Sequence, residues 1–289
     1  MSTAILSILS GIGGMFGWGI YDFLGGVYAK QIGPFKSFFW SQLAGLLSAL
    51  LLIFVFTISF NVPLAVIILL PIAAIIYSAG YLFFFKGFEI GNVSIVAATM
   101  NLWAVFTMLF AFIFMGQRLS TIQTLGVLMI IAGVTLASLN WRDIKNQRFQ
   151  LSSGVKETVS GAFFFGVFWN ISEVISEEIG WLLTTLLVKF GIILFLLLFS
   201  FFKKRELDLT RDGTKTKCMV ALMGIIEAGA VAIVNYGLTI GDAILITPIA
   251  SALSIVTITM AIIFLKDKIT KFQGLGILTA IAGIIVTAF

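Results

Sequence analysis

The ionisable residues inside long apolar stretches are the first candidates for chemistry in this sequence. Asp22, Glu173, Lys189 and Glu227 each lie within such a stretch, and Lys86 lies close to the end of one. A charged side chain in the interior of a bilayer costs about 2.5–3.5 kcal/mol on insertion scales, so each of these residues needs a function or a partner. The chain contains no histidine. A carboxylate is therefore the obvious group to carry a proton near neutral pH.

Glu227 is the strongest of these candidates because it lies near the centre of its apolar stretch. It is nine residues from Cys218 and eleven from Leu238. At about 1.5 Å per residue, it lies roughly 14 Å from one end of the predicted helix. A carboxylate at that depth could carry a proton, or it could hold the amine of a cationic or amino-acid solute. A protonated glutamate that only bonds a neighbouring helix is the structural alternative.

The remaining charged residues have more local interpretations. Glu173 lies within about one turn of Glu177 and Glu178, which predicts an acidic cluster facing an opening of the protein. Lys189 lies about two turns inside its stretch. We expect it to form a structural ion pair, with Glu173 as the candidate partner. Asp22, Glu173 and Glu227 are thus the candidate sites for proton coupling or charge.

Aromatic, amide and hydroxyl side chains within the apolar stretches form a second set of candidates. Aromatic rings with a polar tip suit a pocket for a mostly apolar or planar solute, although Trp and Tyr also form belts at the membrane interface. Amides and hydroxyls in lipid contact a solute or bond between helices. The candidate solute-binding residues are Trp18, Tyr21, Tyr77, Tyr81, Asn101, Trp103, Trp169, Asn170, Asn235, Tyr236 and Ser251.

The composition predicts the elements that hold these residues. Of the 289 residues, 60% are hydrophobic and only 11% are charged, against about 25% charged in a soluble domain. Lipid offers no partner to backbone groups, so a long apolar stretch must be a helix. These runs are too long and continuous for barrel strands. Ten stretches have transmembrane length: roughly 4–28, 37–57, 63–85, 93–115, 121–139, 158–175, 181–202, 218–238, 243–265 and 272–289.

An internal repeat divides the chain into two halves. With a shift of 150 residues, segment 87–92 aligns with 237–242 and segment 123–126 aligns with 273–276, without a gap. With a shift of 147 residues, segment 14–33 aligns with 161–180. We therefore expect five helices in residues 1–140, a polar linker at 141–156 and five helices in residues 157–289. Five is odd, so the second copy must be inverted, an arrangement typical of secondary transporters with a site at the repeat interface.

The two halves end in similar segments. They are Phe114-Met115-Gly116-Gln117-Arg118-Leu119-Ser120 with Gln123, Gly126 and Gly133, and Phe264-Leu265-Lys266-Asp267-Lys268-Ile269-Thr270 with Gln273, Gly276 and Gly283. These segments resemble the repeat ending of the drug/metabolite transporter superfamily of EamA type, and the resemblance covers essentially the whole chain. The family usually has a glutamate just after the fourth and ninth helices, where this chain has Gln117 and Asp267. It often has a proline early in those helices, where this chain has Ala98 in the first half and Pro248 in the second.

The resemblance implies a carrier driven by a gradient, without an ATPase site. Members of this superfamily export amino acids, drugs and metabolites or import sugars. We expect a secondary transporter of a small organic solute in the cell membrane, as a monomer or homodimer, with lipid and solute as partners and with no enzyme activity, cofactor, metal or nucleic acid. A sugar uptake permease is the alternative. A membrane scaffold or receptor, or an intramembrane enzyme, is a weaker one, because paired aspartates and histidines are missing from the sequence.

Positive charge is distributed unevenly over the predicted loops. Of the 18 lysines and arginines, all except Arg118 and the buried Lys189 fall in or beside the loops after the first, third, fifth, seventh and ninth stretches. Positive loops stay in the cytoplasm, which predicts that both termini lie outside. The family usually keeps its termini inside, and we give the charge distribution precedence.

We therefore predict that a tag on either terminus is labelled by an impermeant reagent in intact cells. A tag that becomes accessible only after the cells are permeabilised would contradict this orientation.

Overall fold

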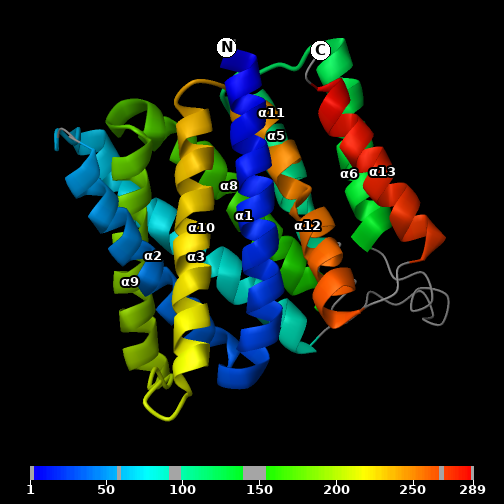
Figure 1. Ribbon diagram of the computed structural model, residues 1–289. Helices are drawn as coiled ribbons and strands as arrows, with labels where there is room; N and C mark the ends of the chain where they lie inside the picture. Colours follow the sequence, from blue (N-terminus) through cyan, green and yellow to red (C-terminus); the bar gives the residue numbers. More distant parts are fainter. Residues whose placement is uncertain (1–2, 57–59, 91–98, 139–153, 267–269, 288–289) are drawn as a thin grey trace.

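The computed structural model describes residues 3–56, 60–90, 99–138, 154–266 and 270–287, and within them all regular secondary structure is helical. Figure 1 shows the helices side by side, with both chain termini at one end of the molecule. The helices are α1 (Thr3–Ile32), α2 (Pro34–Val55), α3 (Leu64–Ile90), α5 (Leu102–Phe114), α6 (Thr121–Ser138), α8 (Val155–Ile179), α9 (Trp181–Lys203), α10 (Thr214–Leu238), α11 (Ala243–Ser251), α12 (Leu253–Met260), the π-helical η1 (Ala261–Leu265) and α13 (Lys271–Val286).

Each predicted apolar stretch corresponds to helix in the described part of the chain. Seven spans are long and apolar enough to cross a membrane, counting α11, α12 and η1 together, and α5, α6 and α13 are shorter apolar helices. The predicted stretch 93–115 is helical from Leu102 to Phe114, and its residues 93–98 lie outside the described residues.

The ninth predicted stretch is not one continuous helix, because it is interrupted at Ala252. Pro248 lies inside α11 and offers no backbone N–H to the helix. The Ser251 hydroxyl donates to the Pro248 carbonyl oxygen at 2.7 Å, and the Ala252 N–H bonds to Ile249 O at 3.1 Å in place of the usual carbonyl four residues back. These local bonds tighten the last turn of α11 and separate it from α12.

The first two helices of each half are joined by the same turn. Gly33 links α1 to α2 with φ 86° and ψ 146°, and Gly180 links α8 to α9 with φ 79° and ψ 159°, a region open essentially to glycine alone. The Ser37 N–H bonds to Gly33 O at 3.0 Å, and the Thr184 N–H bonds to Gly180 O at 3.1 Å. The 147-residue repeat is therefore a repeat of backbone conformation.

The last helix of each half begins with the same cap and packs against its equivalent. The side chains of Ser120 and Gln123 cap α6 reciprocally, as those of Thr270 and Gln273 cap α13. The two helices then approach through glycines: a Cβ atom on Gly133 would lie 2.4 Å from Ala280 N. Only glycine permits such close contact between the two backbones.

The two halves share one interior. In the central group, α1 packs against α10 and α3 packs against α8. Helix α2 packs against α9 and α10, and α9 packs against α2, α3 and α10. Each helix of this group therefore has a partner from the other half of the chain. Figure 1 shows this group beside the α6–α13 pair, with the turn between α9 and α10 at the end opposite the termini.

The backbones of α2 and α10 approach closely where the two helices cross, through Gly45 and Gly224. A Cβ atom on Gly224 would lie 1.9 Å from Ser41 O, and one on Gly45 would lie 2.8 Å from Gly224 O. The two backbones are thus in direct contact. This contact brings Gln42 on α2 to the level of Glu227, which lies one turn beyond Gly224 on α10.

We predict that Gly224→Ala destabilises the protein by about 1–3 kcal/mol or more, because the added methyl group collides with backbone atoms that cannot rotate away. Gly229→Ala on the same helix is the matched control, since a Cβ atom there meets nothing within 4 Å and alanine favours helix by up to about 1 kcal/mol. Thermal unfolding of both variants in detergent measures the difference. Equal stability of the two variants would contradict the described α2–α10 contact.

Candidate functional site

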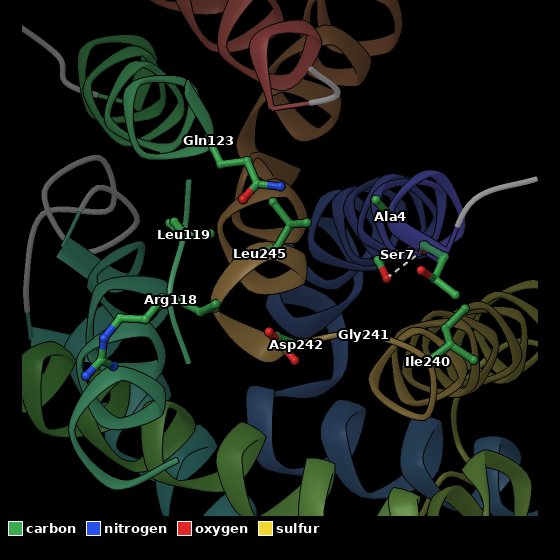
Figure 2. A pocket seen from close by; sticks show the side chains of 11 residues that line it. Ala4, Ser7, Arg118, Leu119, Gln123, Ile240, Gly241, Asp242 and Leu245 are labelled. Atoms are coloured by element: carbon green, nitrogen blue, oxygen red, sulfur yellow. Dashed lines mark hydrogen bonds between the residues drawn. The ribbon is translucent and has the colours of Figure 1, made fainter. Parts of the chain in front are cut away.

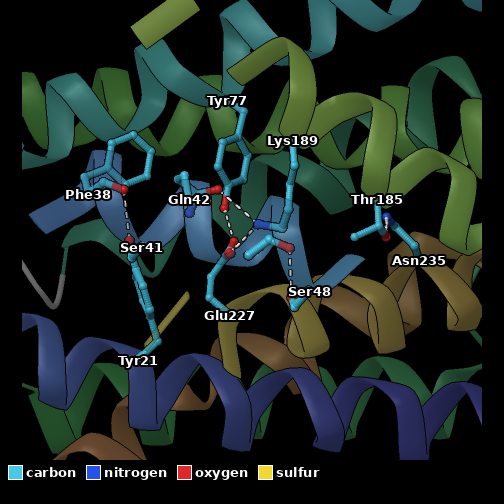
Figure 3. A network of polar contacts seen from close by, with 11 residues as sticks. Tyr21, Phe38, Ser41, Gln42, Ser48, Tyr77, Thr185, Lys189, Glu227 and Asn235 are labelled. Carbon is cyan, nitrogen blue, oxygen red and sulfur yellow. Dashed lines mark hydrogen bonds and ion pairs between the residues drawn. The ribbon is translucent and has the colours of Figure 1, made fainter. Parts of the chain in front are cut away.

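Four buried polar side chains from four helices meet in the middle of the molecule (Figure 3). The Tyr77 hydroxyl on α3 donates to Glu227 Oε1 on α10 at 2.7 Å. The Lys189 ammonium on α9 forms an ion pair with Glu227 Oε2 and also donates to Gln42 Oε1 on α2 at 3.0 Å. All four side chains are buried. We refer to Gln42, Tyr77, Lys189 and Glu227 as the central network.

The central network is built from two pairs of repeat-equivalent positions. Tyr77 and Glu227 are 150 residues apart, and Gln42 and Lys189 are 147 apart, the two shifts that align the halves. The Tyr77–Glu227 hydrogen bond is therefore a contact between equivalent positions of the two halves. The prediction that Lys189 pairs with Glu173 is wrong: the partner of Lys189 is Glu227, because α9 and α10 both pack against α2 at this level.

The network is electrically balanced, with one buried cation and one buried anion. Removing one member of a buried ion pair typically costs 3–5 kcal/mol, because the other charge is left without compensation. Gln42 contributes a further feature. Its Nε2 atom is buried and makes no hydrogen bond of normal geometry among the described residues.

Aromatic side chains surround the network and extend it toward α1 and α5. Tyr81 stacks on Phe38 at 4.4 Å between ring centroids, and Tyr77 contacts Phe168 at 4.7 Å. Tyr21 lies beside the network, with its hydroxyl 3.3 Å from Ser41 Oγ. The structure thus brings Tyr21, Tyr77 and Tyr81 together around the central network.

Three tryptophans from three helices form the other end of this aromatic region. Trp18 on α1 contacts Trp169 on α8 at 5.1 Å and Trp103 on α5 at 6.1 Å between ring centroids. Trp103 and Trp169 lie 6.2 Å apart. Phe168, 4.9 Å from Trp169, connects this tryptophan cluster to Tyr77. Asp22 lies one turn beyond Trp18 on α1 and is partly buried.

Tyr236, which the sequence also offered as a solute contact, lies apart from this region. Its side chain is 39% exposed and packs against Trp181, with ring centroids 6.3 Å apart. The reason is helical geometry: Tyr236 is nine residues, or about two and a half turns, from Glu227 and therefore lies on the opposite face of α10.

The amide and hydroxyl candidates take part in bonds within and between helices. Asn170 Nδ2 donates to Thr107 O at 3.2 Å, which joins α8 to α5. Asn235 Nδ2 donates to Thr185 Oγ1 at 3.0 Å, and Asn235 Oδ1 accepts from Ser172 at 2.9 Å. Such bonds hold membrane helices together.

The last two polar candidates lie near the interruption of the ninth stretch. Ser251 bonds to its own helix at Pro248 O, and Asn101 Oδ1 lies 3.4 Å from Ser254 Oγ. This second contact joins the beginning of α5 to α12.

The buried Glu173 and the partly buried Gln117 form a separate network at the end of the molecule that holds the termini. Gln117 Nε2 lies 2.9 Å from both Glu173 carboxylate oxygens. The Ala243 N–H bonds to Glu173 Oε1 and the Ile244 N–H to Gln117 Oε1, each at 3.1 Å. A carboxylate is favoured at the N-terminus of a helix such as α11, where N–H groups point outward.

The predicted acidic cluster at an opening is therefore corrected for Glu173. Glu177 and Glu178 are exposed, whereas Glu173 is buried and turned toward α11. In the sequence, Gln117 stands out only as a departure from the family pattern, and Gln42 is not identified as a site residue. The available signal for Gln42 was a polar residue in an apolar stretch, at the repeat equivalent of Lys189.

A pocket of about 270 Å³ lies beside the Glu173–Gln117 network, between the starts of α1 and α11 (Figure 2). Ser7, Gln123, Asp242 and Leu245 are among the residues that line it. Arg118 also borders it, but its guanidinium group turns away and lies 3.9 Å from the centre of the Phe112 ring. Within the described part of the chain, no group of three His, Cys, Asp or Glu side chains could hold a metal ion.

We predict that Gln117→Glu destabilises the protein by about 1–3 kcal/mol at neutral pH, because it replaces a donor with a second carboxylate beside Glu173. Gln123→Glu is the control, since the Gln123 side chain only accepts a hydrogen bond in its cap. The double variant Gln117→Glu with Glu173→Gln restores one amide and one carboxylate. It should recover most of the stability that Gln117→Glu loses, as measured by thermal unfolding. Failure of the exchanged pair to recover stability would refute the pairing.

Comparison with known proteins places these features in a family. Residues 5–139 and 153–289 each match the EamA-like transporter family. A crystal structure with 16% sequence identity superposes with a TM-score of 0.78, over 97% of this chain and 95% of that chain, which shows a shared fold. Comparison with curated proteins finds no matching sequence. The two matched segments cover most of the protein, and the chain therefore belongs to the EamA-like transporter family.

Proposed function

We propose that the protein is a gradient-driven secondary transporter that moves a small organic solute, such as an amino acid, a metabolite or a drug, across the cell membrane. The solute binds between two inverted five-helix halves, residues 1–140 and 157–289, joined by the linker 141–156. All ten apolar helices cross the bilayer. Membership of the EamA-like transporter family supports a transport function in general, and the features below support this mechanism.

The meeting of repeat-equivalent residues in the central network carries the proposal. When two inverted copies are related by a two-fold axis in the membrane plane, equivalent positions come together only near that axis. Tyr77 meets Glu227 and Gln42 meets Lys189, so the network marks the axis. In transporters with inverted repeats the solute site lies at this interface, near the midplane of the bilayer.

The aromatic region beside the network suits a small solute. Tyrosines with hydroxyl groups lie next to the central network, and the tryptophan cluster lies next to them. Pockets for small molecules are mainly apolar, with a few polar groups that set orientation. Trp18, Tyr21, Tyr77, Tyr81, Trp103 and Trp169 are the proposed contacts, whereas Asn101, Asn170, Asn235 and Ser251 hold the surrounding helices in place.

Glu227 has a proposed role that follows from its partner. In the ion pair with Lys189, the charge of Glu227 is already compensated by a buried cation. We propose that the pair must open or exchange partners during the transport cycle. A variant that leaves Lys189 charged and alone should then be unable to complete the cycle.

Two further features of the proposed transporter concern its surroundings. Basic residues occur at the ends of α3, α9 and η1 and at the beginnings of α2, α10 and α13. These helix ends lie at the end of the molecule opposite the termini (Figure 1). This end faces the cytoplasm, because positive residues are retained there. The protein works as a monomer or homodimer.

We predict that liposomes containing the purified protein accumulate at least one solute from a panel of radiolabelled amino acids, sugars and organic cations under an imposed pH or sodium gradient. Glu227→Gln should reduce this accumulation at least tenfold, and Glu178→Gln, at an exposed position of α8, should leave it unchanged. If no solute exceeds its flux in protein-free liposomes, the proposed function fails. If Glu227→Gln transports with unchanged rate and pH dependence, Glu227 is purely structural.

A further inference from the structure

Positive charge is concentrated in the segment that joins α9 to α10. Residues 203–217 contain six basic and three acidic side chains, a net charge of +3, whereas the whole chain has a net charge of +5. The six basic side chains are all exposed, and within the described part of the chain none of them forms an ion pair. We refer to these residues as the basic patch, which consists of Lys203, Lys204, Arg205, Arg211, Lys215 and Lys217.

Two of the three acidic residues in this segment are occupied by other partners. Asp212 pairs with Lys36 at the beginning of α2, at 4.0 Å. The Asp208 carboxylate accepts hydrogen bonds at 2.7 Å from both the N–H and the hydroxyl of Thr210. These bonds, with the nearby charges of Lys36 and Lys217, hold the pKa of the Asp208 carboxyl below its usual value. The two carboxylates therefore shape the loop rather than form ion pairs with the basic patch.

The loop that carries the basic patch is held against the membrane helices. Trp40 Nε1 on α2 donates to Leu207 O at 2.7 Å, and the side chains of Leu207 and Leu209 pack against the hydrophobic core. The Ser200 hydroxyl on α9 donates to Arg205 O at 2.7 Å. The basic side chains therefore extend from a fixed backbone, which lowers the entropic cost of binding a ligand.

The basic patch begins where the apolar outer surface of α9 ends. Phe201 and Phe202 are 79% and 75% exposed, and on a helix long and apolar enough to cross a membrane such rings face lipid. Lys203 and Lys204 follow directly, at a rise of about 1.5 Å per residue. Figure 1 shows this turn at the end of the molecule opposite the termini. The basic patch therefore lies at the level of the lipid headgroups on that side of the membrane.

The internal repeat does not account for the basic patch. The shift between equivalent residues is 147 for Gln42 and Lys189 but 150 for Tyr77 and Glu227, so the second half is three residues longer between these points. The α9–α10 loop lies in this interval. The corresponding residues of the first half, 53–67, contain no charged side chain. The patch is thus a separate feature of the second half, which points to a function of its own.

We infer that the basic patch binds the phosphate groups of anionic phospholipids at the membrane surface. Clusters of about four to eight Lys and Arg residues next to a membrane helix attract anionic headgroups, and the guanidinium groups of Arg205 and Arg211 suit bidentate bonds to phosphate. The rings of Phe201 and Phe202 contact the acyl chains of the same lipids. A bound lipid then holds together the ends of α9 and α10, which carry the ion pair of the central network. This inference does not depend on the proposed transport function.

Titration of the purified full-length protein in detergent with dioleoylphosphatidylglycerol or dioleoylphosphatidylcholine, followed by native mass spectrometry, tests the inference. We expect the anionic lipid to bind about tenfold more tightly than the zwitterionic lipid. The double variant Arg205→Gln with Arg211→Gln should weaken binding of phosphatidylglycerol about fivefold or more, and Arg205→Lys with Arg211→Lys should retain most of the affinity. As the control, Lys156→Gln with Lys271→Gln removes two exposed charges outside the patch and should leave the affinity nearly unchanged.

Thermal unfolding provides an independent measurement, because a ligand that binds the folded protein stabilises it. Phosphatidylglycerol should raise the unfolding midpoint of the unchanged protein and not that of the variant Arg205→Gln with Arg211→Gln. Equal affinity for the two lipids, unchanged phosphatidylglycerol affinity in this variant, or an equal loss in the control variant would overturn the inference. Glycerol 1-phosphate at millimolar concentration should not displace the lipid, and displacement would show that the patch takes a soluble phosphate instead. Solute flux in liposomes, which tests the transport function, is not part of any of these outcomes.

Discussion

The ion pair between Lys189 and Glu227 is the constraint on which the arrangement of the central helices depends. A lysine and a glutamate with almost no exposed surface are tolerated only when they meet and their remaining bonding capacity is used. Four helices must therefore converge at one level, with Tyr77 and Gln42 supplying the other hydrogen bonds. The glycines at the α2–α10 crossing permit the backbone contact that brings these side chains within reach.

Duplication explains why the network is built from unlike residues. Near the proposed two-fold axis, a residue would meet its own equivalent from the other half, so an identical pair of glutamates or lysines would place like charges together. Divergence to Tyr77 and Glu227, and to Gln42 and Lys189, replaces such a clash with a hydrogen bond in each pair. The α6–α13 pair faces no such conflict, because two equivalent glycine surfaces pack well together. The glycines at this contact are the same in both halves.

Local features could be predicted from the sequence, whereas partners across helices could not. The apolar stretches, the repeat shifts and the equivalence of Tyr77 with Glu227 follow directly from the residues. The partner of Lys189 does not, because periodicity gives the face of a residue on its own helix but not which helix that face meets. Tyr236 shows a related limit: its presence in an apolar stretch does not give its angle from Glu227, which places it on the opposite face of α10. The interruption at Ala252 depends on local bonds near Pro248 rather than on hydropathy.

The central claim, that Lys189 and Glu227 compensate each other at the interface of the two halves, is tested most directly by a double-mutant cycle on the free energy of unfolding in detergent. Lys189→Met and Glu227→Gln alone should each cost about 3–5 kcal/mol, since each leaves one buried charge. The double variant carries no net buried charge, so it should be more stable than the sum of the single effects predicts, by about 2 kcal/mol or more. Additive effects of the two substitutions would contradict the account.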